Sequence, residues 1–285
     1  MSSADKRVLI ILAALWGGSF IFIRLAAPVF GPILMVEARV VIAGISLLCY
    51  ARVARIRLGM RTWWRQYLVL GAINSAVPFL LISSSEVRLT ASMAVLLNAT
   101  SPLFGAVVAV FVLGDALTAR KLIGILTSIC GVCALVGWSP IKHDIATLLS
   151  IAASLAGALS YGFAGAYIKA KMKNAPAIGM ACGSMLGAAI LIAPFAVFSH
   201  VMAPLNAAAV GSVVALAFIC TTLAYILYFR LVISAGPANA LSVTFLTPVF
   251  GLALGAMFIG EPITPVKVMA CFMILAGTAI MVTER

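Results

Sequence analysis

The sequence predicts an all-α polytopic membrane protein, with ten transmembrane helices arranged as two inverted five-helix repeats around a central cavity. The first observation is composition: 64% of the residues are hydrophobic and 9% are charged, whereas soluble domains have about 45–50% apolar and about 25% charged residues. The second is that the apolar residues form long blocks over the whole chain. The third is a phrase that occurs twice, at residues 101–115 and 247–261.

Each apolar block is long enough to cross a bilayer. Blocks of roughly 18–24 residues span about 30 Å of hydrocarbon as helix. The first block follows the polar start MSSADKR, and we expect a retained helix there because no clear small-residue cleavage site for a signal peptide follows it. The predicted spans are 8–26, 33–51, 67–86, 91–113, 121–138, 145–168, 177–198, 208–230, 237–260 and 264–283.

Lys and Arg are concentrated on alternate connections between the spans. If both termini are cytoplasmic, most of the 19 Lys and Arg residues lie on the cytoplasmic side, as the positive-inside rule requires. The opposite side then holds only Arg24, Arg88, Lys142 and Lys267. The net charge of +12 therefore reflects topology, and we expect no nucleic-acid partner.

The repeated phrase divides the chain into two halves. SPLFGAVVAVFVLGD at 101–115 is matched, 146 positions later, by TPVFGLALGAMFIGE at 247–261. We assign residues 1–141 to repeat 1 and residues 142–285 to repeat 2, with five spans each, in one integral membrane domain. Because five is odd, repeat 2 enters the membrane from the opposite side. Such inverted repeats underlie many secondary transporters, with the substrate site at midplane between the halves.

Pro102 and Pro248 occupy matching positions at the centres of two spans. A proline lacks an N–H and disturbs the carbonyl four residues earlier, here at Asn98 and Thr244. A freed carbonyl in hydrocarbon must find a partner or line a cavity. A hydroxyl that heals a packing kink and a bend that borders a substrate are both compatible with this pattern. The candidate binding residues beside these prolines are Asn98, Ser101, Thr244 and Thr247.

Further candidates lie in other spans. Asn74 and Pro78 predict a polar bend in the span 67–86. Trp16 lies near the centre of the first span, although tryptophan usually prefers the membrane interface; core packing with an indole hydrogen bond explains it equally well. Tyr161 and Tyr225 are the other aromatic candidates for substrate contact.

Glu37 and Arg39 are the only ionisable residues expected deep within the spans. They are two residues apart and project to different sides of a helix, so each is expected to have another partner, in a structural or a coupling role. We expect no cation in the cavity, which argues against carriers of phosphorylated sugars. The first span has no carboxylate, which argues against carriers of permanent cations. A neutral, zwitterionic or aromatic solute fits better.

No catalytic or metal-binding set is expected. The six cysteines fall in apolar runs and are interpreted as small residues that pack between helices. The pair Cys130 and Cys133 cannot complete a tetrahedral metal site alone, and the histidines, His143 and His200, lie at the ends of spans. We therefore expect no enzyme, no cofactor and no metal, with an intramembrane enzyme as the alternative from another class.

Several of these features together resemble the EamA-like exporters of the drug/metabolite transporter superfamily. They are Trp16-Gly17 in the first span, Arg39 in the second, the two aligned prolines, and the acidic turns GDALT and GEPIT, each followed by a glycine-containing helix. More narrowly, the chain resembles the bacterial branch that exports aromatic amino acids and related amphiphiles. It departs from the pattern at Asp115, where Glu is preferred, and at Ala270, where the first repeat has Gly124.

The resemblance implies a basket of ten helices and export across the bacterial inner membrane by alternating access. The expected partners are a small-molecule substrate, such as an aromatic or other neutral amino acid or an amphiphilic drug, and the lipid bilayer; a monomer is expected. An importer, or an exporter of another neutral metabolite class in the same fold, remains the main alternative. The natural substrate and the coupling to protons stay open.

Overall fold

The computed structural model describes residues 1–138 and 144–282, and in these ranges the regular structure is entirely helical. Among the described residues, eight helical segments are long and apolar enough to cross a membrane, when consecutive elements such as those in Met60–Glu86, Ala91–Leu113 and Ala207–Ala235 are counted as one segment. A shorter apolar helix covers Pro265–Met281. The predicted boundary between residues 141 and 142 lies outside the described residues, as do Lys142 and His143.

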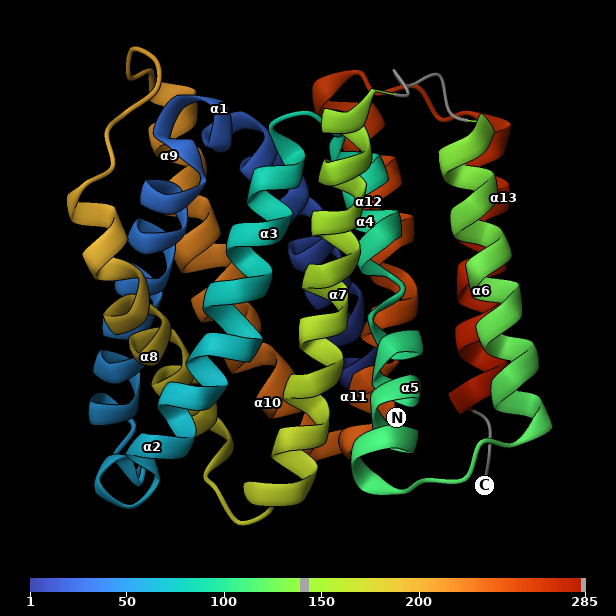
Figure 1. The fold of residues 1–285 in the computed structure, drawn as a ribbon. Helices are drawn as coiled ribbons and strands as arrows, with labels where there is room; N and C mark the ends of the chain where they lie inside the picture. The colour runs from blue at the N-terminus through green and yellow to red at the C-terminus, as the bar shows by residue number, and fades with distance from the viewer. Residues whose placement is uncertain (139–143, 283–285) are drawn as a thin grey trace.

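The helices run side by side between an upper and a lower edge (Figure 1). Their bounds are α1 (Ser3–Val53), α2 (Met60–Gly71), α3 (Val77–Glu86), α4 (Ala91–Asn98), α5 (Ser101–Leu113), α6 (Ala119–Trp138), α7 (Ile145–Lys171), α8 (Ala177–Val197), α9 (Ala207–Ala217), α10 (Ala224–Ala235), α11 (Pro237–Leu241), α12 (Val243–Ile259) and α13 (Pro265–Val282), with two π-helical turns, η1 (Ala72–Ala76) and η2 (Phe218–Leu223).

The helix α1 contains both of the first two predicted spans, which is why fewer than ten separate long helices are found among the described residues. Its 51 residues are interrupted at Gly31, where φ is 74° and ψ is 153°. That backbone conformation favours glycine. The chain reaches the upper edge there and then descends toward α2 (Figure 1). The carbonyl of Val29 accepts hydrogen bonds from the amides of Met202 and Ala203, at 2.8 and 3.2 Å. This carbonyl next to the interruption therefore has hydrogen-bond partners outside its own helix.

Other predicted spans are interrupted near their centres. The span 91–113 is divided into α4 and α5, and Pro102 is in the first turn of α5. The span 67–86 contains η1 immediately before Pro78. The helix α12 runs through Pro248 without a break, because the interruption comes earlier, at Ser242. The predicted bend in that span is thus displaced by half a dozen residues from its proline.

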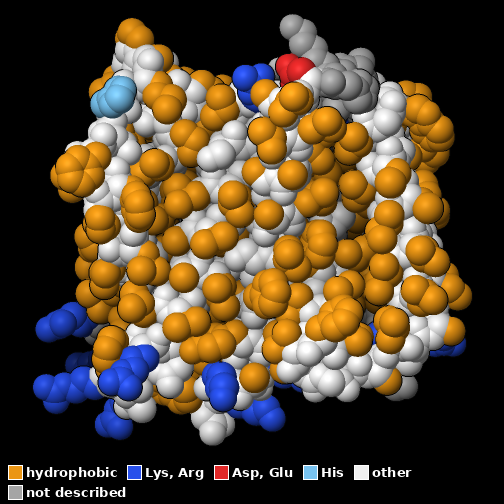
Figure 2. Space-filling model, viewed as in Figure 1, with side chains coloured by type: hydrophobic (Ala, Val, Ile, Leu, Met, Phe, Trp, Pro, Cys, Tyr) orange, Lys and Arg blue, Asp and Glu red, His pale blue; other side chains and the backbone are white. Residues whose placement is uncertain are grey.

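Charge is distributed unequally between the edges. Figure 2 shows Lys and Arg side chains gathered at the lower edge, over the turn between α1 and α2, below a broad apolar band. The lower edge also carries the ends of α7 and α10. An apolar belt between polar edges is the surface that a multi-pass membrane protein presents to lipid.

The helices α6 and α13 pack against each other through glycines. Ser128 donates a hydrogen bond to the carbonyl of Ile274 at 3.4 Å. A Cβ atom added at Gly124 would lie 2.5 Å from the carbonyl oxygen of Gly277 and 2.5 Å from Met281. Because higher residue numbers on one helix face lower numbers on the other, the pair is antiparallel. Small residues permit this close approach of two membrane helices.

Replacement of Gly124 by alanine should therefore weaken the pairing of α6 with α13. We expect an unfolding free energy lower by about 1–3 kcal/mol, the usual range for overpacking, measured as reduced thermal stability in detergent. Gly137→Ala is the matched control on the same helix, because a Cβ there meets nothing within 4 Å. Equal stability of the two variants would contradict the packing described.

Candidate functional site

A cavity of about 580 Å³ lies between the helices at the centre of the molecule. This volume is within the range of small-molecule sites, which is about 300–1,000 Å³. All eight predicted binding residues line it, from positions spread over both halves of the chain: Trp16, Asn74, Asn98, Ser101, Tyr161, Tyr225, Thr244 and Thr247. Pro102 and Pro248 also line it, whereas Pro78 and Glu37 do not.

Two of the aromatic residues precede glycines that lie in close contact with the proline-containing segments. A Cβ at Gly17 would lie 2.7 Å from both the Gly251 nitrogen and the Thr247 carbonyl oxygen. A Cβ at Gly162 would lie 2.9 Å from the Gly105 nitrogen. Each proline-containing segment is thus held against a glycine, and the residue before that glycine, Trp16 or Tyr161, lines the cavity.

The aromatic wall extends beyond the predicted residues. Trp16 lies 5.5 Å from Tyr228 and 6.4 Å from Tyr225, between ring centroids. Phe229 contacts both tyrosines, at 6.1 and 5.4 Å. Positions 225, 228 and 229 share one face of α10 by helical spacing, a signal that was available in the sequence. Such a cluster suits the apolar or aromatic part of a ligand.

Arg39 also lines the cavity, and the expectation of a cavity without cations is wrong. The side chain is 6% exposed. Its Nε donates to the Thr221 hydroxyl at 3.0 Å, and its guanidinium carbon lies 3.9 Å from the Phe79 ring centroid. Within the described residues, no carboxylate forms an ion pair with it. In a helix that is apolar nearly all round, the sequence did not reveal which face Arg39 occupies.

The hydroxyls next to Pro102 and Pro248 donate hydrogen bonds to backbone carbonyls. The Ser101 hydroxyl donates to the Asn98 carbonyl at 2.6 Å, and the Thr247 hydroxyl donates to the Val243 carbonyl at 2.9 Å. The first bond satisfies the Asn98 carbonyl at the break before Pro102, which was one of the two explanations offered by the sequence, whereas the second lies within the unbroken helix α12. The amide of Asn74 donates to the Tyr225 hydroxyl at 3.5 Å. The hydroxyl oxygens retain lone pairs for a ligand.

Buried charge is more extensive than expected. Glu37 has one carboxylate oxygen that is buried without a hydrogen-bond partner among the described residues. Glu86 is fully buried, with neither carboxylate oxygen bonded in the described chain, and Lys267 is 6% exposed. Glu37 and Arg39 are therefore not the only ionisable groups in the interior. Glu86 was overlooked because it ends its span, where exposure is the usual outcome.

The upper end of the cavity is covered by charged contacts. Glu261 accepts hydrogen bonds from the amides of Ala91 and Ser92, at 2.8 and 2.9 Å, and so caps α4 with both carboxylate oxygens. Lys267 lies 3.9 Å from the same carboxylate. Arg24 donates to the carbonyl of Glu86 at 2.6 Å. An anion at a helix N-terminus is stabilising, so these bonds hold the upper edge together.

The lower end is lined by residues near helix termini. Ile168 is close to the end of α7, Ala177 begins α8, and Leu241 ends α11. The lining thus reaches the lower edge of the molecule, whereas at the upper end it stops at Ile23 and Ile82. The cavity extends toward the edge where the basic side chains gather (Figure 2).

The family model described as the EamA-like transporter family matches this chain twice, over residues 7–137 and 148–283. The chain belongs to the EamA-like transporter family. A relative from Salmonella typhimurium, named a probable amino-acid metabolite efflux pump, is 23% identical over 97% of this chain and 94% of its own length. A protein of the same name from Escherichia coli is also 23% identical, with the same coverage.

The fold of this EamA-like chain is shared by a solved structure. A crystal structure covering 98% of this chain and 96% of its own superimposes with a TM-score of 0.69 at 18% sequence identity, which shows the shared fold. An uncharacterised transporter from Bacillus subtilis, YvbV, is 23% identical over 97% of this chain and 88% of its own length. This EamA-like chain is therefore a multi-pass membrane transporter.

Among the residues that the structure describes in this EamA-like chain, no group of three or more His, Cys, Asp or Glu side chains is placed to hold a metal ion. Three of the six cysteines do not pack between helices, contrary to the expectation from the sequence. Cys49, Cys130 and Cys133 are exposed on the helices, and Cys182, Cys220 and Cys271 are buried. Only the buried ones act as small packing residues.

Glu261→Gln tests the closure of the upper end. The Gln side chain has one acceptor oxygen where the carboxylate has two, so one of the two hydrogen bonds from the backbone amides of α4 is lost. A hydrogen bond to a charged group contributes about 1.5–3 kcal/mol to stability. We expect hydrogen–deuterium exchange in the peptide that begins α4 to accelerate by roughly tenfold or more. Asp115→Asn is the control, because Asp115 pairs with Lys169 on the lower surface. Unchanged exchange in Glu261→Gln would show that this cap does not hold α4.

Proposed function

We propose that the protein exports aromatic and other neutral amino acids, and related small amphiphilic metabolites or drugs, across the bacterial inner membrane by alternating access. In this proposal it belongs to the aromatic amino acid branch of the family and acts as a monomer with cytoplasmic termini. Ten membrane-crossing segments form two inverted repeats, and the eight cavity residues bind substrate. Arg39 binds substrate and Glu37 is structural.

The observation that carries the proposal is the combination of Arg39 with the aromatic wall in one cavity. An amino acid presents a carboxylate at one end and an apolar or aromatic group at the other. The guanidinium of Arg39 has no carboxylate partner in the described chain, and Arg binds carboxylates through two parallel hydrogen bonds. Asn98 and the hydroxyls at the helix breaks are suited to the ammonium group.

Contacts between α6 and α13 support the inverted repeats. Under the shift of 146 positions, Gly124 corresponds to Ala270 and Gly131 to Gly277. Gly124 faces Gly277, which is the equivalent of Gly131, and Gly131 faces Ala270, which is the equivalent of Gly124. A two-fold axis requires this exchange of contacts. Ser128 bonds to Ile274, its own equivalent. In antiparallel helices such an axis lies in the membrane plane.

The unequal ends of the cavity support alternating access. With the basic lower edge facing the cytoplasm, the cavity is open inward and sealed outward by the Glu261 and Arg24 contacts. Release of substrate on the other side then requires α4 to separate from Glu261. The curated relatives named efflux pumps support export as the direction.

Arg39→Gln tests carboxylate recognition. In proteoliposomes, we expect the affinity for labelled phenylalanine to fall by roughly 10–100-fold, because a charge-assisted bond contributes about 1.5–3 kcal/mol. Competition by phenylethylamine, which lacks the carboxylate, should change much less. Arg39→Lys keeps the charge and controls for folding. Equal losses for the acid and the amine would refute the role of Arg39, and absence of saturable flux in the wild type would refute transport of amino acids.

Trp16→Ala tests the aromatic wall. Loss of a buried Trp contact should reduce the affinity for phenylalanine by roughly tenfold and that for alanine by less, since aromatic pairs contribute about 0.5–1.5 kcal/mol beyond burial. Trp16→Phe should retain most of the affinity. Trp138→Ala is the matched control, because Trp138 is 69% exposed and lies away from the cavity. The measurement is counterflow of both amino acids, and a uniform loss would contradict the assignment.

A further inference from the structure

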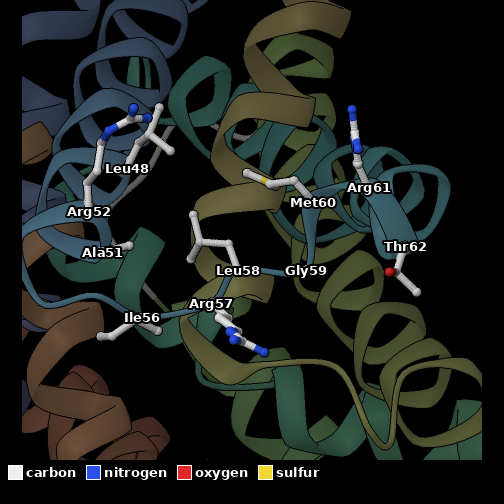
Figure 3. A pocket seen from close by; sticks show the side chains of 10 residues that line it. All are labelled: Leu48, Ala51, Arg52, Ile56, Arg57, Leu58, Gly59, Met60, Arg61 and Thr62. Atoms are coloured by element: carbon white, nitrogen blue, oxygen red, sulfur yellow. The ribbon is translucent and has the colours of Figure 1, made fainter.

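A second pocket, of about 460 Å³, lies at the lower edge where α1 ends and α2 begins. Figure 3 shows Leu58 and Met60 near its centre, with the guanidinium groups of Arg52, Arg57 and Arg61 around them. The pocket is separate from the central cavity and shares no lining residue with it. It therefore combines an apolar floor with a cationic rim.

The cationic rim is not neutralised by the protein. Five arginines fall within residues 52–65, and the sequence has no Asp or Glu from residue 38 to residue 85. In the part of the chain that the structure describes, none of the five forms an ion pair or a hydrogen bond through its side chain. The like charges repel one another, so an anion placed among them is stabilised.

The walls of the pocket are held in place. At the end of α1, the Ile56 amide donates to the Ala51 carbonyl at 2.8 Å. The Tyr67 hydroxyl donates to the Leu58 carbonyl at 2.7 Å. Gly59 precedes α2 as its N-cap residue and provides no side-chain cap, so the first amides of α2 add their partial positive charge to that of the arginines. The pocket is thus formed before any ligand arrives.

The surroundings of the pocket are apolar on the side of the membrane. Leu48, Val53 and Trp64 are 36%, 86% and 56% exposed, and they continue the apolar belt of the helices down to the arginines. Tryptophan at the end of a membrane helix typically lies at the level of the lipid headgroups. A ligand held there has its anionic group among the arginines and its apolar part against exposed hydrocarbon-facing side chains.

We propose that this pocket binds the headgroup of an anionic phospholipid from the leaflet that surrounds the lower edge. The phosphate lies between Arg52, Arg57 and Arg61, and the acyl chains follow Leu48 and the outer surface of α1. Free phosphate shares the charge but gains nothing from the apolar floor and border. The site acts as an anchor for one lipid molecule, independently of the solute in the central cavity.

Native mass spectrometry of the full chain in detergent tests the proposal. Phosphatidylglycerol and phosphatidylcholine with identical acyl chains are titrated against the wild type and against the triple variant Arg52→Gln, Arg57→Gln and Arg61→Gln. We expect the wild type to retain phosphatidylglycerol at least tenfold more tightly than phosphatidylcholine. The triple variant should lose that preference, because basic residues near an anionic headgroup each contribute measurably to its binding.

The control variant carries Arg7→Gln, Arg120→Gln and Arg230→Gln, which remove the same charge from exposed positions outside the pocket. We expect it to retain the preference for phosphatidylglycerol. An equal loss in both triple variants would mean a general effect of net charge and would overturn the proposal. Displacement of the lipid by millimolar inorganic phosphate would also overturn it, because the site would then be a simple anion site.

Discussion

The structure depends on one constraint: every backbone N–H and C=O inside the bilayer needs a partner, since each unsatisfied group costs several kcal/mol in hydrocarbon. A helix in lipid is therefore interrupted only where side chains satisfy its ends or where it borders a cavity. The interruption between α4 and α5 borders the central cavity through Asn98 and Ala99. The interruption at Gly31 lies at the upper edge, where the amides of Met202 and Ala203 satisfy the Val29 carbonyl.

The two π-helical turns follow the same constraint. The first, η1, begins at residue 72, and the second, η2, begins at residue 218, which is 146 positions later. A π-helical turn adds a residue to the helix and leaves a carbonyl without its usual donor, and such turns are frequent at functional sites. Here they carry Asn74 and Cys220, both of which line the cavity. Thr221 of η2 accepts the hydrogen bond from Arg39, so the distortion also orients the buried cation.

The sequence was sufficient to predict what depends on length, repetition and local chemistry. Apolar lengths predicted a chain of membrane-crossing helices, of which eight long ones and one shorter one are found among the described residues. The aligned prolines led to four of the polar residues at the cavity, among them Asn98 and Thr247, but not to Ser19, Arg39 or Ser184. What depends on helix rotation was not predictable. Nearly every face of α1 is apolar, so periodicity could not show that Arg39 turns inward. The burial of Glu86 depends on helices that are distant in sequence, and no local pattern encodes it.

The acidic turns after α5 and α12 have the same local structure and different partners. Each follows a glycine with positive φ, 74° at Gly114 and 67° at Gly260, and each acidic residue donates its amide to a carbonyl six residues earlier at 3.2 Å. Yet the Glu261 side chain is 9% exposed and caps α4, whereas the Asp115 side chain is 35% exposed and pairs with Lys169 at 3.4 Å. Local sequence cannot explain this difference, because the two turns match. It arises from contacts distant in sequence, since Glu261 meets the start of α4 and Asp115 meets the end of α7. In the alternating access that we propose, a movement that exchanged these two environments would open the upper edge and close the lower one.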